Sequence, residues 1–259
     1  MEARLTEFSY GYCVTEELAN GPGPRLIAAP YFPSLYTEGK KGGGFDVKIG
    51  AALFLQFKLA DEMTRFSATE AQLNLLTPRF YRFWLHRRDR SNQHQMLINL
   101  ENEPGNQVYY IAPRFADVNA LDNAYRNRAV VERSAMFSPS EIGPLPDNRY
   151  HRIAFSRNGN SAWFLSEPQK VPVRHKKELF DRGYKAARTS KFRQLDDWLQ
   201  SLTTRMIAIR HEYTKLRINI RNDVPLIERS PLDEAAYQAR THFGCELLLL
   251  AEPVGNEVP

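Results

Sequence analysis

The chain has 259 residues, of which 42% are apolar and 12% aromatic, enough for a large hydrophobic core in one or two domains. Charged residues of both signs are interspersed and make up 25%, which argues against a disordered or collagen-like chain, and the net charge of +5 permits a polyanionic partner. The two cysteines, Cys13 and Cys245, form no CxxC motif, which argues against a disulfide scaffold or a zinc site and favours a cytoplasmic location.

The sequence predicts neither secretion nor a membrane partner. Acidic residues, Glu2 and Glu7, occupy the N-terminal region where a secretory signal needs basic residues followed by an apolar run. The longest aliphatic stretch, residues 247–251, is far shorter than the roughly 20 residues of a spanning helix.

The first part of the chain predicts an α/β core. Apolar residues recur at helical spacing until Asn20-Gly21-Pro22-Gly23-Pro24, which ends the first helix. Two β-like runs further on form a predicted hairpin, and residues 60–90 are treated as an insertion. The predicted elements are a helix at 4–19, a strand at 25–29, the hairpin strands at 45–49 and 53–59, a helix at 92–102 and a strand at 107–112.

The rest of the chain predicts a mixed α/β extension, residues 116–259, packed on a core formed by residues 1–115. A pronounced basic segment occupies residues 170–193. The predicted elements are a helix at 118–127, strands at 129–131, 151–155 and 162–165, a helix at 195–216 and a strand at 246–250.

Three polar residues after the glycine run at 42–44 have the chemistry of a metal and phosphate site. Asp46 begins one strand of the predicted hairpin, and Gln56 and Lys58 project from one face of the other because strand side chains alternate. Phosphodiester hydrolysis near neutral pH needs a divalent cation, and hard cations prefer oxygen ligands. The residues at 54–58 are otherwise apolar, so a Gln and a Lys on one side of that strand indicate a polar site.

This pattern resembles the Asp…(Asp/Glu/Gln)-x-Lys signature of the PD-(D/E)xK, or restriction-endonuclease-like, nuclease superfamily. The resemblance covers residues 4–112 and implies an αβββαβ core. It also implies that Asp46 and Gln56 bind Mg²⁺ or Mn²⁺ and that Lys58 is the catalytic lysine. Two features depart from the pattern: no Pro precedes Asp46, and Gln56 replaces the second acid, offering a neutral amide oxygen with weaker metal binding.

Members of this superfamily often add a metal-binding Glu from the first helix, and Glu7 is the candidate here. On a helical wheel Glu7 shares a stripe with Gly11, whose missing side chain permits close approach of the helix to the sheet. Glu16 and Glu17 remain alternatives, because the helix is apolar on its other side as well.

Each site residue also has an ordinary structural interpretation. Asp46 after three glycines can be a turn residue, Gln56 a satisfied core amide, and Lys58 a strand-end residue with its ammonium in solvent. His94, on the predicted helix after the hairpin, can reach phosphate or be a surface or capping residue. His211, His242 and Cys245 match no ligand spacing and are set aside.

Nucleic-acid contacts are predicted in two basic places. One precedes the glycine run, and the other is the basic segment, which mixes cations with aromatic residues as nucleic-acid surfaces do, although such a run is usually a solvated face. The candidate residues are Lys40, Lys41, Lys176, Lys177, Lys185 and Arg188.

Together these features predict a metal-dependent endonuclease that acts on DNA. The Gln variant resembles nucleases of restriction and antiphage defence systems, which implies a defence role. A dimer is expected for a cutter of both strands. The alternative is an inactive nuclease-like subunit that binds a protein partner, motivated by the missing second acid and by the aromatic segments at 80–85 and 109–110.

Overall fold

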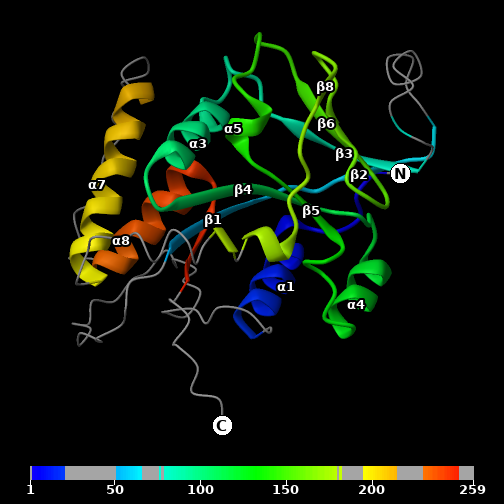
Figure 1. Cartoon of the computed structure of the whole chain (residues 1–259), viewed down its shortest axis with the longest axis horizontal. Coiled ribbons are helices and arrows are strands. Elements are labelled where there is room, and N and C mark those ends of the chain that lie inside the picture. Colours follow the sequence, from blue (N-terminus) through cyan, green and yellow to red (C-terminus); the bar gives the residue numbers. More distant parts are fainter. Residues whose placement is uncertain are drawn as a thin grey trace.

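Two β-sheets and the helices around them make up the part of the chain that the computed structural model describes (Figure 1). The described residues are 2–20, 51–65, 76, 79–179, 181–182, 195–214 and 230–250. The helices are α1 (Glu7–Asn20), α3 (Gln93–Asn102), α4 (Val118–Arg126), α5 (Pro139–Ile142), α7 (Leu195–Thr214), α8 (Pro231–Gln238) and the π-helix η1 (Ala239–Phe243).

The first sheet has the strand order β5-β4-β1-β9, with β1 at its centre. On one side β1 pairs in parallel with β4, and on the other it pairs antiparallel with β9. A parallel pair needs a long crossover, and the chain between these two strands includes α3. The strands of this sheet are β1 (Ala51–Phe57), β4 (Asn106–Pro113), β5 (Ser134–Phe137) and β9 (Glu246–Leu250).

The second sheet is antiparallel and has the order β2-β3-β6-β7-β8. Alternation along β3 directs Tyr81, Phe83 and Leu85 into the main core, whereas Trp84 between them is exposed and Phe80 packs in a small separate cluster. The strands are β2 (Asp61–Met63), β3 (Phe80–Leu85), β6 (His151–Ser156), β7 (Ala162–Phe164) and β8 (Gln169–Lys170).

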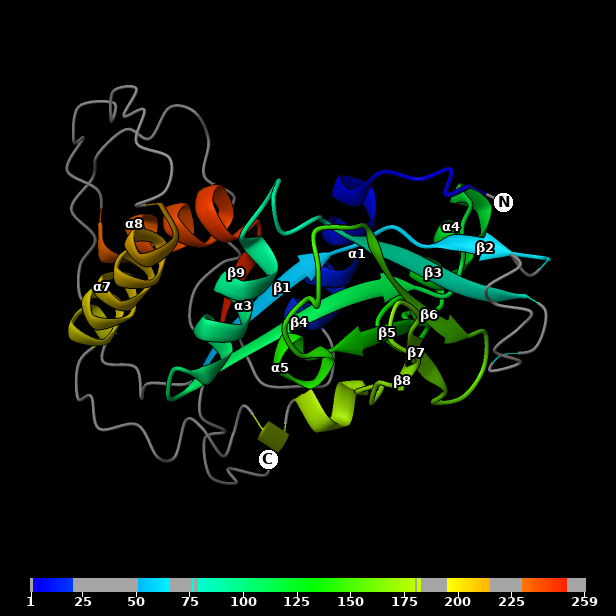
Figure 2. The same ribbon diagram turned by 90° about the horizontal axis from the view of Figure 1, so that it is seen from above.

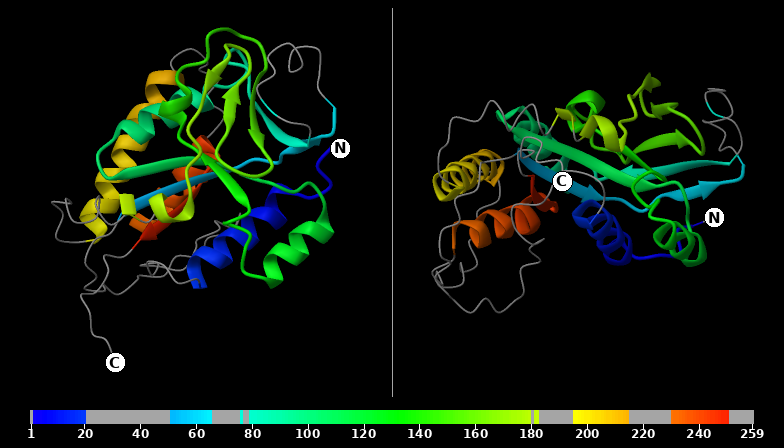
Figure 3. Two further views of the ribbon diagram at one scale, coloured as in Figure 1. Left: turned by 45° about the vertical axis from the view of Figure 1, so that its right-hand side comes forward. Right: turned by 60° about the horizontal axis from the view of Figure 1, so that its bottom comes forward.

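The two faces of the first sheet belong to different hydrophobic cores. Ala52 and Phe54 pack with the second sheet and with α3 and α7, whereas Leu53 and Leu55 pack with α1 and α4. Figure 3 shows α1 and α4 on one side of the sheet and the second sheet on the other, and Figure 2 looks down on these layers, with α7 and α8 at one end. Gln56 therefore continues the face of Phe54, toward the second sheet and α3.

The mixed α/β class is confirmed, and most predicted elements occur close to their expected positions. β1 and β4 match the predicted strands at 53–59 and 107–112, and α1 and α3 match the first two helices. The predicted strand at 129–131 is wrong: these residues lie in turns, and the strand β5 follows at Ser134.

The predicted hairpin is the main difference. Both edges of β1 are paired, by β4 and by β9, so β1 is a central strand and β9 takes the place that the prediction gave to a hairpin partner. The expected strands at 25–29 and 45–49 lie outside the described residues. Residues 60–90 are more than an insertion, because they supply β2 and β3 of the second sheet.

Both sheets draw strands from both sides of the predicted boundary at residue 115. The first sheet takes β5 and β9 from beyond it, and the second takes β6, β7 and β8. None of the helices in the described ranges combines the length and the apolar character needed to cross a bilayer.

Candidate functional site

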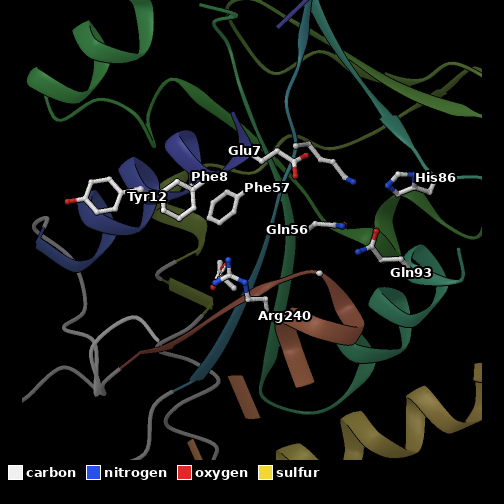
Figure 4. Close-up of a pocket in the computed structure, with 12 residues that line it drawn as sticks. Glu7, Phe8, Tyr12, Gln56, Phe57, His86, Gln93 and Arg240 are labelled. Carbon is white, nitrogen blue, oxygen red and sulfur yellow. Dashed lines mark ion pairs between the residues drawn. The ribbon is translucent and has the colours of Figure 1, made fainter. Parts of the chain in front are cut away.

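A pocket of about 370 Å³ opens at the carboxyl end of β1. Its wall includes one end of α1, the strand end itself, the loop after β3, the start of α3 and the η1–β9 turn. Figure 4 shows the side chains directed toward it from these elements. The polar residues are Glu7, Gln56, Lys58, His86, Gln93, Arg240 and Glu246.

Gln56 and Lys58 share one wall of this pocket, as their spacing predicts. Both are buried, with 5% and 8% of their surface exposed. The Oε1 atom of Gln56 has no hydrogen-bond partner among the described residues. A buried amide oxygen without a partner is uncommon in proteins, and one that lines a pocket is available to a ligand.

The ammonium of Lys58 lies beside an aromatic ring instead of a counter-ion. Its Nζ is 5.7 Å from the ring centroid of Tyr110, and no carboxylate of the described residues is within ion-pair distance. Burial lowers the pKa of Lys58, while the negative charge of Glu7 acts in the opposite direction. Lys58 is thus a desolvated amine that faces an acidic residue across the pocket.

Tyr110 is held in place by His94 from α3. The ring Nδ1 of His94 accepts a hydrogen bond from the Tyr110 hydroxyl at 2.8 Å, and Nε2 donates to the carbonyl of Gly143 at 2.8 Å. The two rings also stack, with centroids 5.8 Å apart. Burial lowers the pKa of His94 to about 4, so the ring is neutral. His94 therefore supports the pocket from behind, and the alternative of a surface histidine is wrong.

Glu7 reaches the pocket because α1 packs closely on the sheet at Gly11. A Cβ atom at Gly11 would lie 2.8 Å from the ring of Phe57, so a larger residue would displace one of the two elements. The predicted role of Gly11 is confirmed. Glu16 and Glu17, the other candidates on α1, are engaged elsewhere: Glu16 pairs with Arg128 at 3.0 Å, and buried Glu17 accepts the backbone N–H of Val130 at 2.6 Å.

Several pocket residues were not anticipated from the sequence. Gln93 donates through Nε2 to the carbonyl of Phe243 at 2.9 Å and thereby joins α3 to η1. Arg240 pairs with Glu246 at 3.3 Å, and burial raises the pKa of Glu246. Arg240 lies on the π-helix η1. π-Helical turns are frequent at functional sites, but nothing in the sequence of this segment predicts one.

His86 also lines the pocket, and it is exposed. Partial burial lowers its pKa, and the neighbouring charge of Lys58 adds to this effect. The alternation of β3 offers the one usable sequence signal, because it places residues 82, 84 and 86 on the polar side of the strand.

The predicted nucleic-acid residues are not brought to this pocket by the described part of the chain. Asp46, Lys40, Lys41, Lys185 and Arg188 lie outside the described residues. Lys176 and Lys177 do not line the pocket: Lys176 is 3.5 Å from the carboxylate of Glu17, and Lys177 is exposed to solvent.

Within the described ranges, no group of three or more His, Cys, Asp or Glu side chains is arranged to hold a metal ion. Comparisons with protein-family models, with curated proteins and with solved structures each gave no match.

Proposed function

We propose that this protein is a metal-dependent nuclease whose active centre is the pocket at the end of β1. The observation that carries the proposal is the meeting of Glu7, Gln56 and Lys58 in one cavity. Glu7 comes from α1, which covers one face of the first sheet, and Gln56 and Lys58 come from β1 at the centre of that sheet. The sequence pattern and its resemblance to the nuclease superfamily single out the same three residues.

The proposal places a hard divalent cation such as Mg²⁺ beside Glu7 and Gln56. The Oε1 atom of Gln56 is buried and has no hydrogen-bond partner in the described part of the chain, and the carboxylate of Glu7 lines the same pocket. Asp46 would supply the second carboxylate, and water and a substrate phosphate complete the coordination that Mg²⁺ prefers. When bound, such an ion neutralises charge on the phosphoryl oxygens and lowers the pKa of the attacking water.

Lys58 has two functions in this proposal. The lowered pKa increases the fraction of neutral amine, which accepts the proton of the attacking water, and the ammonium formed in that step offsets the charge that develops on the phosphate. Hydrolysis adds the water oxygen to phosphorus and breaks one bridging P–O bond. The water proton passes to Lys58, and the leaving oxygen takes a proton from solvent.

A cleavage assay tests the proposal. Linear or plasmid DNA incubated with the protein and Mg²⁺ should be cut, and Lys58→Met or Asp46→Ala should reduce the rate by about 100-fold or more, the typical contribution of one acid–base or electrostatic group. Arg149→Met is the control, because that arginine is exposed, does not line the pocket and lies outside the predicted nucleic-acid contacts. Unchanged cutting by the first two variants would remove this site from consideration.

A second function, a nuclease-like binding or assembly subunit, is favoured by the small number of carboxylates among the described residues of the pocket. Of its two carboxylates, Glu246 is paired with Arg240, which leaves Glu7 and the neutral Gln56 as oxygen donors within the described chain. Calorimetry with Mn²⁺ in the presence of DNA separates the two functions. Heat of binding that disappears in Glu7→Gln favours the nuclease, and its absence in the wild type favours the subunit.

A further inference from the structure

Two large aromatic side chains at the edge of the pocket are open to solvent. Phe8 has 70% and Tyr12 51% of its surface exposed, and both line the pocket. They are four residues apart and therefore adjacent on one face of α1. In Figure 4 their rings lie with that of Phe57 on one side of the pocket, and Gln56, His86 and Gln93 lie on the other.

These two rings are not required by the hydrophobic core. Tyr10 and Val14, on the buried face of the same helix, fill that core with none of their surface exposed. Neither Phe8 nor Tyr12 stacks on another ring of the described residues. Exposed apolar groups that gather at a pocket are typical of a binding site.

The polar residues on the other side of the pocket indicate which kind of ligand these rings bind. Among the described residues, the ammonium of Lys58 has no carboxylate within ion-pair distance and the oxygen of Gln56 has no hydrogen-bond partner. A ligand that fits both sides carries an anionic group for the lysine and a flat apolar face for the rings. Nucleotides of a single strand have this combination, because cationic grooves hold their phosphates and aromatic side chains stack on their bases.

We propose that the substrate of this pocket is single-stranded nucleic acid, with unpaired bases stacked on Phe8 and Tyr12 and an adjacent phosphate at Lys58. Inside a duplex the faces of the bases are covered by their neighbours and are not available to the rings. The inference rests on the proposed function for the position of the phosphate, and it adds the strandedness of the substrate.

Binding measured by fluorescence anisotropy in EDTA, where Mg²⁺-dependent cleavage cannot proceed, tests the inference. The probes are a labelled 12-nucleotide oligothymidylate, an abasic strand of the same length and a duplex hairpin. We expect the wild type to bind oligothymidylate at least about tenfold more tightly than the other two probes. The double variant Phe8→Ala/Tyr12→Ala should lose this preference, and Phe8→Trp/Tyr12→Trp should keep it.

Tyr150→Ala is the matched control, since Tyr150 is an exposed aromatic residue just before β6 that does not line the pocket. Its affinity for oligothymidylate should stay within twofold of the wild type. Because the substituted rings are exposed, the variants should keep the wild-type circular dichroism spectrum.

Three outcomes overturn the inference: wild-type binding of oligothymidylate that is no tighter than that of the abasic strand, wild-type binding that is no tighter than that of the duplex hairpin, or unchanged binding by the double alanine variant. If any of these occurs while Mg²⁺-dependent, Lys58-dependent cutting is observed, the nuclease proposal stands and the single-strand proposal fails. If binding depends on the rings but no cutting occurs with Mg²⁺, the nuclease proposal fails and the ring platform for single strands stands.

Discussion

Lys58 carries a positive charge in a place where burial disfavours it. Burial lowers its pKa, so the folded protein releases this proton more readily than the unfolded chain does. The charge therefore destabilises the fold at neutral pH, and this cost decreases as the pH rises from the folded pKa of Lys58 toward about 10.5. A group that destabilises its own fold while pointing into a pocket is typical of a functional residue.

Lys58→Met should therefore stabilise the protein while it abolishes activity. Replacing a buried charge by an apolar side chain of similar length should raise the free energy of unfolding by about 1–2 kcal/mol at pH 7, with a smaller gain at higher pH. Denaturant titration measures the change, and exposed Lys177→Met should leave the stability unchanged. A less stable Lys58→Met would show that the lysine contributes to structure.

The burial of His94 in its neutral form predicts that the fold loses stability in acid. Its pKa is about 4 when folded and near 6.5 when unfolded, so its contribution to stability is complete above pH 6.5 and decreases as the pH falls toward 4. The loss from this residue should reach about 3 kcal/mol at pH 4, from 1.36 kcal/mol for each pKa unit. Denaturant titrations between pH 7 and 4 should show a shallower decline for His94→Gln than for the wild type. Parallel curves would contradict the assignment.

At the scale of elements, the periodicity of the sequence predicts the helices and strands and the faces on which their side chains lie. Which elements then pack together depends on contacts between residues far apart in the chain. The alternation of Phe54, Gln56 and Lys58 predicts their common face, and the helical spacing of Glu7 and Gly11 predicts how α1 meets the sheet. These parts of the site follow from the sequence, because each depends on one element and its period.

The remaining pocket residues could not be predicted, because elements far apart in the chain bring them together. Gln93 reaches Phe243 across 150 residues, and β9 pairs with β1 across almost 200. Likewise the sequence of residues 45–59 predicts a hairpin, but the antiparallel neighbour of β1 is β9, from far along the chain. Local patterns do not specify which strand a buried strand pairs with.

The η1–β9 turn gives a test of this long-range contact. Gly244 has φ of +66°, and a Cβ there would lie 2.2 Å from Nε2 of Gln93. Gly244→Ala should cost about 1–2 kcal/mol for the left-handed backbone and about 1 kcal/mol more for the disturbed hydrogen bond of Gln93. Gly159→Ala is the control, with φ of +87° but open space around it. Equal thermal shifts in the two variants would exclude a structural role of the Gln93 contact.

At the scale of the whole molecule, β9 closes the first sheet and contributes to both cores. Leu247 and Leu249 belong to one core, and Leu248 and Leu250 belong to the other. Burial of each leucine stabilises the fold by about 1.5–3 kcal/mol, so the four together are comparable with the whole stability of a typical domain.

A chain that ends at Gly244 should therefore fail to fold, whereas a chain that ends at Leu250 keeps all of β9 and should fold. Far-UV circular dichroism and thermal melting of the two truncated proteins check this expectation. A cooperative melting transition in the shorter chain would show that the fold does not need β9 and would contradict this expectation.

The most direct test of the nuclease centre compares two glutamates of α1. Glu7 lines the pocket, whereas Glu16 pairs with Arg128 outside it. In single-turnover cleavage of a labelled single-stranded DNA with Mg²⁺, Glu7→Gln should reduce the rate by about 100-fold or more, and Glu16→Gln should stay within about twofold of the wild type. Equal rates for Glu7→Gln and the wild type, or a wild type that does not cut with Mg²⁺, would contradict the assignment of this pocket as a nuclease centre.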